Sequence, residues 1–309
     1  MIKFLKKVVL FFALMAVIDV ACGFGFDVLK KNAKGGDTRK NYYIAEECCD
    51  DILILGSSRA ARHYDPALLE DFLGMTCYNC GEPGCGIITA YARYKMVVER
   101  NSPKIVIYEV SPRFDYLKGE DYSKYLGRVR QYSNKPVVRA MFLEMGDNLE
   151  YLRLFSNMYR NNSFFLQNIM DNLQSHKDNK GFEPLFGFMK PDAKYNRIIL
   201  NNPENDSIKL HYLEMLITEL QQKDTKLFFV VSPKCISEED ASKEKVEYEP
   251  IIAMCMKYGV PFINYTYMEG ISDNYRYFHD RMHLNQEGAS AYTKAICKEL
   301  GVVYGGLSY

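Results

Sequence analysis

The chain has 309 residues, of which 48% are hydrophobic and 25% charged, and this is ordinary for a globular protein built as one large domain or two small ones. Lys and Arg together number 39, as do Asp and Glu, so the formal net charge is zero. This balance and the lack of a nucleic-acid motif exclude nucleic acid as an expected partner.

Residues 1–28 are predicted to form an uncleaved signal anchor, that is, a transmembrane segment. Three lysines lie among the first seven residues, and Asp19 is then the only charge in the 19 residues from Val8 to Phe26. A bilayer is spanned by roughly 20 apolar residues. A cleaved signal peptide is the alternative. No small-x-small cleavage site follows the apolar run, and Asp19 argues against a lipoprotein cleavage box before Cys22.

Residues 29–48 are predicted to be a juxtamembrane linker, because residues 31–46 are rich in Lys, Gly, Asp and Asn. Basic residues lie on this side of the segment as well, so the positive-inside rule gives no orientation. A very short N-terminal tail normally stays in the cytoplasm. We therefore expect a membrane-anchored protein whose domain is extracytoplasmic, in the periplasm or at the cell surface.

Residues 49–305 are predicted to form an α/β domain, because short apolar runs alternate with helical patterns. Strands that read as unbroken apolar runs indicate a parallel sheet covered on both faces, which is a three-layer architecture. The expected strands are Ile52–Leu55, Met75–Tyr78, Lys104–Val110, Lys226–Val231 and Pro261–Tyr265, and the expected helices are Ile87–Val98, the stretch around Leu213–Leu220, Val246–Tyr258 and a last helix capped by Asn285.

Residues 117–205 interrupt this alternation and are predicted to be an inserted helical and loop region. A helix-like stretch runs from Asp147 to Leu173, and the loop Gly181–Gly187 is apolar for a loop. Two interpretations stay open. The insertion could cover the site as part of a substrate channel, or it could be a peripheral helical subdomain.

Ser58 is the first candidate for chemistry. Functional sites in parallel sheets lie at the carboxyl ends of strands, and Ser58 follows the strand Ile52–Leu55 at a Gly-Ser-Ser turn that opens a helix. Such a turn exposes the hydroxyl and directs backbone N–H groups at a developing oxyanion. A serine still needs a base, and taken alone this turn is more often a helix cap.

His283 is the candidate base. Asp280 lies three residues upstream, close enough in a loop to accept a hydrogen bond from one imidazole nitrogen and leave the other for the proton of Ser58. The alternative is a helix start in which Asp280 caps and His283 is solvated. His279 is a weaker candidate, since no acid precedes it by three residues.

Taken in order, these blocks resemble the SGNH/GDSL family of esterases and acyltransferases. Gly56-Ser57-Ser58 stands where that family has its Gly-Asp-Ser block, and Asp280-x-x-His283 matches its closing block, with Asn285, Gly288 and Ala289 after it. Asn79-Cys80-Gly81 stands in place of the family's glycine block. The resemblance covers roughly residues 50–115 and 206–300. It implies a flavodoxin-like sheet, Ser58, Asp280 and His283 as catalytic residues, and the amides of Ser58 and Gly81 as oxyanion donors.

The chain departs from the family pattern at two places. Ser57 replaces the usual Asp, a version found in membrane-attached relatives that act on cell-envelope polymers. The Gly-x-Asn-Asp block is absent, and Ser111 or Arg113 is the candidate substitute for its Asn donor. Loss of one oxyanion donor costs about 100- to 1000-fold in rate. Arg59 and Arg62 follow the nucleophile turn and are candidates for binding an anionic substrate group, against the commoner alternative of surface arginines on the first helix.

The predicted activity is that of a serine-dependent esterase or O-acyltransferase acting on cell-envelope or exported polysaccharide, by a ping-pong mechanism with acetyl as the leading acyl group. The expected partners are an acylated carbohydrate or similar ester, the membrane, and for transfer a membrane acyl-transfer partner. No cofactor and no metal are expected. The alternative is a catalytically impaired, membrane-tethered subunit that binds or assembles polysaccharide.

Nine cysteines leave a further alternative open. Cys77 and Cys80 have the CxxC spacing of redox and zinc sites, but no second CxxC and no His at finger spacing follow, so zinc is not expected. We interpret them as small apolar residues beside a turn, against the alternative of a redox-active dithiol. Some of the nine could pair if the domain is exported.

Overall fold

The computed structural model describes residues 1–119, 121–146, 148–174, 179–190 and 204–303. The chain divides into two compact units, one made of Met1–Glu47 with Asp121–Asp178 and the other of Cys48–Glu120 with Asn179–Tyr309. We call the first the helical unit and the second the α/β unit, and each is described by itself.

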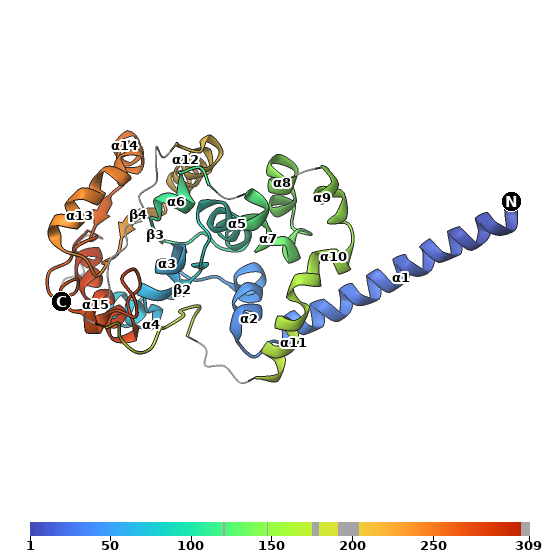
Figure 1. Ribbon diagram of the computed structural model, residues 1–309, viewed down its shortest axis with the longest axis horizontal. Coiled ribbons are helices and arrows are strands. Elements are labelled where there is room, and N and C mark those ends of the chain that lie inside the picture. The colour runs from blue at the N-terminus through green and yellow to red at the C-terminus, as the bar shows by residue number, and fades with distance from the viewer. Residues whose placement is uncertain (120, 147, 175–178, 191–203, 304–309) are drawn as a thin grey trace. The chain divides into compact units, whose positions relative to one another are not determined.

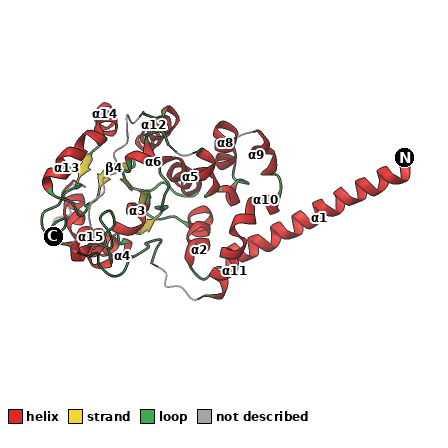
Figure 2. Ribbon diagram, in the orientation of Figure 1, coloured by secondary structure: helices red, strands yellow, loops and turns green. Residues whose placement is uncertain are grey.

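The α/β unit is built on one parallel sheet of five strands in the order β2-β1-β3-β4-β5 (Figure 2). The strands are β1 (Ile52–Gly56), β2 (Cys77–Asn79), β3 (Ile105–Glu109), β4 (Lys226–Val231) and β5 (Phe262–Asn264). All five predicted strands are therefore present, with ends that differ by at most two residues. The predicted α/β architecture with a flavodoxin-like parallel sheet is confirmed.

Helices follow the strands of this unit (Figure 1). They are α3 (Ser58–His63), α4 (Pro66–Leu73), α5 (Ile87–Val98), α6 (Pro112–Asp115), α12 (Ser207–Gln222), α13 (Glu238–Glu244), α14 (Glu249–Tyr258) and α15 (Gln286–Val303), with 3-10 turns at Lys245–Tyr248 and Tyr275–Tyr277. Asn285 caps α15 as predicted, because its Oδ1 accepts the amide of Gly288 at 2.9 Å.

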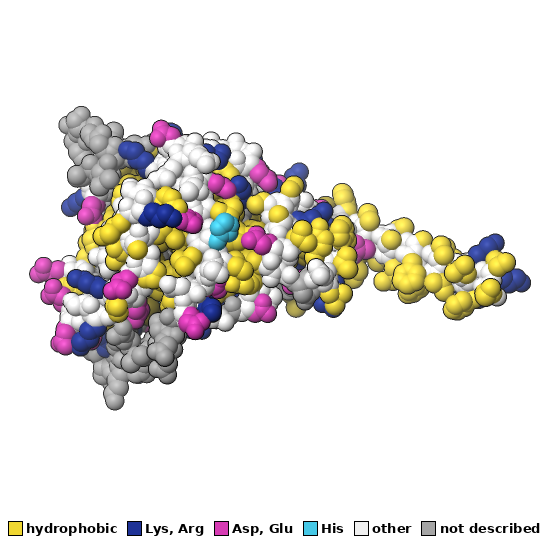
Figure 3. Space-filling view, turned by 90° about the horizontal axis from the view of Figure 1, so that it is seen from above, with side chains coloured by type: hydrophobic (Ala, Val, Ile, Leu, Met, Phe, Trp, Pro, Cys, Tyr) yellow, Lys and Arg dark blue, Asp and Glu magenta, His cyan; other side chains and the backbone are white. Residues whose placement is uncertain are grey.

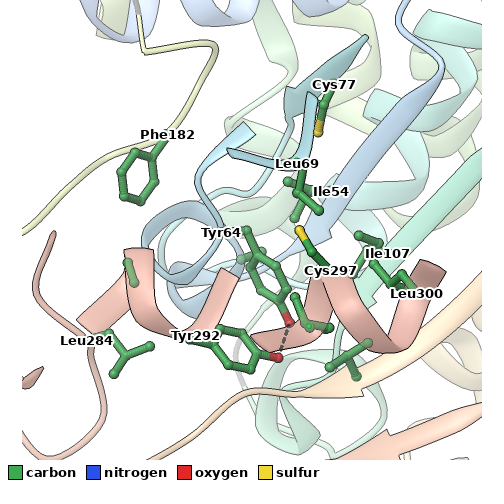
Figure 4. Packing of buried hydrophobic residues seen from close by; sticks show 14 of the residues in the cluster. Ile54, Tyr64, Leu69, Cys77, Ile107, Phe182, Leu284, Tyr292, Cys297 and Leu300 are labelled. Carbon is green, nitrogen blue, oxygen red and sulfur yellow. Dashed lines mark hydrogen bonds between the residues drawn. The ribbon is translucent and has the colours of Figure 1, made fainter. Parts of the chain in front are cut away.

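The core lies on both faces of the sheet because strand side chains alternate between them. Ile54, Ile107 and Val230 lie in one buried cluster with Tyr64 and with the buried stripe of α15 (Figure 4). The members of that stripe are Ala289, Tyr292, Ile296 and Leu300. On α5 and α12, Tyr91 and Tyr212 pack edge to face with ring centroids 5.1 Å apart.

The helical unit begins with α1 (Ile2–Asn32), a helix long and apolar enough to cross a membrane by length and composition. The other helices of this unit are α2 (Gly36–Tyr42), a π-helical turn at Tyr43–Glu47, α7 (Tyr122–Gly127), a 3-10 turn at Arg130–Tyr132, α8 (Pro136–Met145), α9 (Asn148–Arg153), α10 (Asn157–Asn161), a 3-10 turn at Asn162–Phe164 and α11 (Phe165–Leu173).

Residues 29–48 are not the predicted linker. They are mostly helical, as the end of α1, α2 and the π-helical turn, and all of them up to Glu47 pack within the helical unit. Thr38 is buried: its amide donates to Asp171 Oδ2 at 2.9 Å and its hydroxyl to Asn168 Oδ1 at 3.0 Å. Tertiary contacts to residues about 130 positions away therefore override a composition that is typical of loops.

The predicted insertion 117–205 is also divided differently. Residues 121–178 belong with the N-terminal helices, whereas the described residues 179–190 belong with the sheet. The single helix predicted over Asp147–Leu173 is broken, because Ser156 starts a new helix by accepting the amide of Tyr159 at 3.2 Å.

Candidate active site

The Gly-Ser-Ser turn positions Ser58 at the carboxyl end of β1. Gly56 has φ of +129°, and a Cβ there would lie 2.5 Å from the carbonyl oxygen of Glu109, so only glycine fits. Ser57 is the N-cap and Ser58 the first residue of α3. The amides of a first helical turn have no acceptor within the helix, so the Ser58 N–H is left for another partner.

Ser58, His283 and Asp280 form a continuous hydrogen-bonded chain. Ser58 Oγ lies 2.8 Å from His283 Nε2, and His283 Nδ1 lies 2.9 Å and 3.0 Å from the two carboxylate oxygens of Asp280. Nδ1 facing a carboxylate carries the proton, which leaves Nε2 to accept from the serine hydroxyl. The structure thus brings together the three residues that the sequence singled out, although 225 positions separate Ser58 from His283.

Asp280 is held in its charged form. Partial burial by itself would raise its pKa, but the hydrogen bonds from the His283 imidazole and from the amides of Met282 and His283 lower the pKa to about 2. Asp280 is therefore a carboxylate at any pH near neutral, as an orienting group for an imidazole must be.

The segment that carries His283 is fixed at its far end by the start of α15. Asn285 Nδ2 donates to the carbonyl oxygens of Gly187 and Arg276, at 2.8 Å and 2.6 Å. A Cβ on Gly288 would lie 2.1 Å from the carbonyl oxygen of Tyr277, so the chains approach here at a distance that only glycine allows.

A second histidine supports this segment, and sequence reasoning missed it. His63 is fully buried, and its Nε2 accepts the amide of Leu284, the residue after His283, at 3.0 Å. Nδ1 must then carry the proton, and it lies 2.7 Å from Ser232 Oγ, which lies 2.9 Å from Glu109 Oε1. Burial, together with the nearby His283, lowers the pKa of His63, so the ring is neutral. His63 lies five residues after Ser58 with no local pattern to mark it.

Arg59 is not the predicted substrate-binding residue. Its side chain is buried and forms an ion pair with the fully buried Glu109 at 3.2 Å, and it donates to the carbonyl oxygens of Val110 and Ser232. A buried charge requires such a partner, and this pair ties α3 to the ends of β3 and β4. Glu109 also accepts from the Tyr64 hydroxyl at 2.5 Å.

The geometry at Gly81 does not support its predicted role as an oxyanion donor. The chain passes close to α3 there, since a Cβ would lie 2.5 Å from the Ala61 amide nitrogen. The Gly81 N–H, however, donates to Asn79 Oδ1 at 3.0 Å. Asn79 is fully buried, and its Nδ2 donates to the carbonyl oxygens of Ala60 and Tyr64. Asn79 thus fixes the turn to α3, and its side-chain oxygen accepts the Gly81 N–H that was expected to donate to an oxyanion.

The two candidates at the end of β3 have other contacts. Ser111 precedes α6, and its amide donates to Asp115 Oδ2 at 2.6 Å. The exposed Arg113 lies over the ring of Phe114, 5.7 Å from its centroid. Neither observation supports a substitute for the missing Asn.

An apolar loop borders the His283 segment within the α/β unit. The Leu185 carbonyl accepts the amide of Gln286 at 2.7 Å, and the Phe186 carbonyl lies 2.9 Å from His279 Nδ1. The side chains of Phe186 and Phe188 are two-thirds exposed. This short part of the predicted insertion therefore lies beside the candidate site, as the first of the two interpretations requires.

The structure gives no support to the alternative of a redox-active dithiol at Cys77 and Cys80. All nine have free thiols, and Cys77 and Cys80 are buried. Burial raises the pKa of Cys77 well above its ordinary value, which disfavours a reactive thiolate. Among the described residues, no group of three or more His, Cys, Asp or Glu side chains is arranged to hold a metal ion.

No protein-family model matches the chain, and no curated protein matches it in sequence. Several solved structures are similar to it, and three of them are the following. A candidate acylhydrolase from Bacteroides fragilis is 12% identical with a TM-score of 0.42, over 86% of this chain and 95% of that one. A candidate platelet activating factor from Streptococcus pneumoniae is 13% identical with a TM-score of 0.44, over 91% and 98%.

The third is an active-site mutant of a family two carbohydrate esterase from Clostridium thermocellum, 10% identical with a TM-score of 0.38, over 83% of this chain and 64% of that one. An acylhydrolase and a carbohydrate esterase are thus among the similar structures. TM-scores below 0.5 carry no argument about function, so function is proposed from the residues of this chain.

Proposed function

We propose that the chain is a serine-dependent esterase or O-acyltransferase of the SGNH/GDSL type, acting on acyl esters of cell-envelope or exported polysaccharide. The observation that carries this proposal is the unbroken chain from Ser58 Oγ to His283 Nε2 and from His283 Nδ1 to the Asp280 carboxylate. A hydroxyl, an imidazole and a carboxylate in this order are the minimum for an activated serine.

In the proposed mechanism, His283 takes the proton of Ser58 as its oxygen attacks the ester carbonyl. Asp280 keeps the imidazole in the required tautomer and stabilises the imidazolium that forms. His283 then gives the proton to the leaving alkoxide, and an acyl-serine remains. Water or a sugar hydroxyl, deprotonated by the same imidazole, attacks the acyl-serine and releases Ser58 in its original state.

The oxyanion of each step would be stabilised by the amide of Ser58 at the start of α3. Because the Gly81 amide donates to Asn79, a second donor requires this hydrogen bond to be shared or broken. We therefore expect turnover about 100- to 1000-fold below that of an enzyme with a complete set of donors.

The loop beside His283 supports a substrate with an apolar face near the reacting ester. Exposed phenyl rings at Phe186 and Phe188 can contact the apolar face of a sugar ring or an acyl chain. The loop that carries these rings is hydrogen-bonded through Leu185, Phe186 and Gly187 to the segment that carries the base, so a substrate bound on the rings would be held close to it.

The test is reaction of the full chain, purified in detergent, with a fluorophosphonate probe. We expect labelling of the unaltered protein and its loss in Ser58→Ala and His283→Ala. Ser57→Ala is the matched control and should retain labelling, since Ser57 is the adjacent serine and its hydroxyl makes no hydrogen bond to a described residue. Labelling that survives Ser58→Ala would refute the assignment of the nucleophile.

A second candidate function is a non-catalytic, membrane-tethered subunit that binds or assembles polysaccharide. The occupied amide of Gly81 favours it. Absence of labelling in a folded, unaltered chain, combined with binding of polysaccharide that Phe186→Ala weakens, would decide for this second function.

A further inference from the structure

The second half of α1 is part of the helical unit rather than a free anchor. Asp19 accepts hydrogen bonds from the Ser156 hydroxyl at 2.6 Å, the amides of Asn157 and Met158 at 2.8 Å and 2.9 Å, and Asn157 Nδ2 at 3.0 Å. Gly23 makes this approach possible, because a Cβ there would lie 2.6 Å from the Asn157 side chain.

The contacts continue along α1 to its end. The rings of Phe26 and Phe165 pack edge to face with centroids 5.9 Å apart, and Asn172 Nδ2 donates to the Leu29 carbonyl oxygen at 2.8 Å. Cleavage after the apolar run would remove Asp19, Gly23 and Phe26 from these contacts. The structure therefore favours a helix that stays attached.

On helix α11 two polar side chains are buried and most apolar side chains are exposed, which is the reverse of a helix on the surface of a water-soluble protein. Its polar residues Asn168 and Asp171 are each 1% exposed, and both accept hydrogen bonds from Thr38. Its apolar residues face outward, with Leu166 74% and Leu173 75% exposed. Soluble proteins rarely expose a large contiguous apolar patch, and helices facing lipid expose apolar side chains.

The same character extends over the neighbouring helices, and Figure 3 shows hydrophobic side chains along α1 on the visible face. Arg153 is exposed, but from Leu154 to Gln174 no exposed side chain is charged. We call the exposed apolar side chains of this region the apolar collar. Its members are Val20, Phe24 and Val28 on α1, Leu149 and Leu152 on α9, Phe155, Met158 on α10, and Phe165, Leu166, Met170 and Leu173 on α11.

The position of Asp19 sets the depth of this collar. At 1.5 Å per residue the run from Val8 to Phe26 is about 29 Å long, which matches a hydrocarbon core of about 30 Å. Asp19 lies seven residues before Phe26, so it would lie about 10 Å inside the apolar layer. The residues that bind it, from Ser156 to Met158, must lie at the same depth.

We infer that the apolar collar is embedded in one leaflet of the membrane, so that its side chains on α9, α10 and α11 contact lipid acyl chains beside α1. The collar is continuous with the surface of a helix that is apolar enough to cross a bilayer, and the polar side chains of Asn168 and Asp171 on α11 are bonded inward, as hydrocarbon requires. The protein is then a membrane-inserted unit as well as a tethered one. This inference does not depend on the chemistry of Ser58.

The sequence contains no Trp, so single Trp substitutions report on defined positions without background. The full chain is reconstituted into phosphatidylcholine vesicles with or without acyl chains brominated near the headgroup end. Leu166→Trp is the test. Val9→Trp on α1 marks the membrane segment, and Met256→Trp on α14, where Met256 is 79% exposed, is the matched control in the α/β unit.

In vesicles in which Val9→Trp is quenched by brominated lipid, we expect Leu166→Trp to be quenched to at least half that extent and shielded from acrylamide. Met256→Trp should show the reverse. Leu166→Trp that behaves like Met256→Trp would overturn the inference. Shielding from acrylamide without quenching by lipid would also overturn it, because the collar would then be covered by protein.

Discussion

At the scale of single residues, the site depends on buried polar groups that contact no substrate. Glu109 accepts from Tyr64 and Ser232 and pairs with Arg59, and His63 links Ser232 to the amide of Leu284. Each of these groups is buried, so each needs its partner. The position of His283 is consequently linked to the ends of β3 and β4.

His63→Ala tests this link. The substitution leaves the Leu284 amide and the Ser232 hydroxyl short of a partner, and we expect the free energy of unfolding to fall by about 2–4 kcal/mol. Labelling of Ser58 should slow because the His283 segment loses a support. Chemical denaturation measures the first effect and the fluorophosphonate rate the second. The exposed His211→Ala should change stability by less than about 0.5 kcal/mol. An unaltered stability of His63→Ala would contradict the proposed support.

Asp115 gives a prediction about pH. Its burial raises the pKa to about 7, against the lowering effect of hydrogen bonds from Tyr108, Ser111 and Ile87. The folded state therefore binds a proton more tightly than the unfolded state. The resulting stabilisation is complete below the unfolded pKa of 3.8 and is lost as the pH rises through about 7.

We expect the free energy of unfolding of the unaltered chain to fall between about pH 4 and pH 7. Asp115→Asn, which cannot ionise, should remove this part of the slope. Denaturation at several pH values measures it. Equal slopes for the two proteins would show that Asp115 titrates normally.

At the scale of elements, the start of α15 determines where His283 lies. Gly288 in the first turn of that helix touches the Tyr277 backbone, so Gly288→Ala must displace either the helix or the turn. We expect a loss of about 1–3 kcal/mol and a strong reduction of Ser58 labelling. Gly127→Ala on α7 is the control, because nothing lies within 4 Å of a Cβ there. A Gly288→Ala protein with full labelling would show that the helix start tolerates the shift.

At the scale of the whole molecule, two glycines two positions apart test whether α1 is packed or free. Gly23→Ile would drive a side chain into Asn157, whereas nothing lies within 4 Å of a Cβ on Gly25. We expect Gly23→Ile to expose the 121–178 segment to protease in membranes and Gly25→Ile to leave it protected. Equal protection of both variants would mean that α1 does not pack against α10.

The amino-acid sequence was enough to predict the strands of the sheet and the three members of the candidate triad. Unbroken apolar runs predicted all five strands, and the predicted limits of β4 (Lys226–Val231) were those observed. The predicted limits of helix α5 (Ile87–Val98) were also those observed. Asp280 and His283 could be paired because three residues in a loop bring their side chains within reach. These signals are local, since they depend on periodicity and on spacing along the chain.

The roles of the remaining residues depend on partners that only folding brings beside them. Arg59, a candidate for substrate binding, pairs with Glu109. The Gly81 amide, a candidate oxyanion donor, donates to Asn79. The predicted linker around Thr38 is a packed part of the helical unit. His63 supports the site although no sequence pattern marks it. In each case the partner lies in another element, often more than 100 residues away. Burial then makes the pairing obligatory, because a charge or amide withdrawn from water must bond to whatever group the fold places beside it.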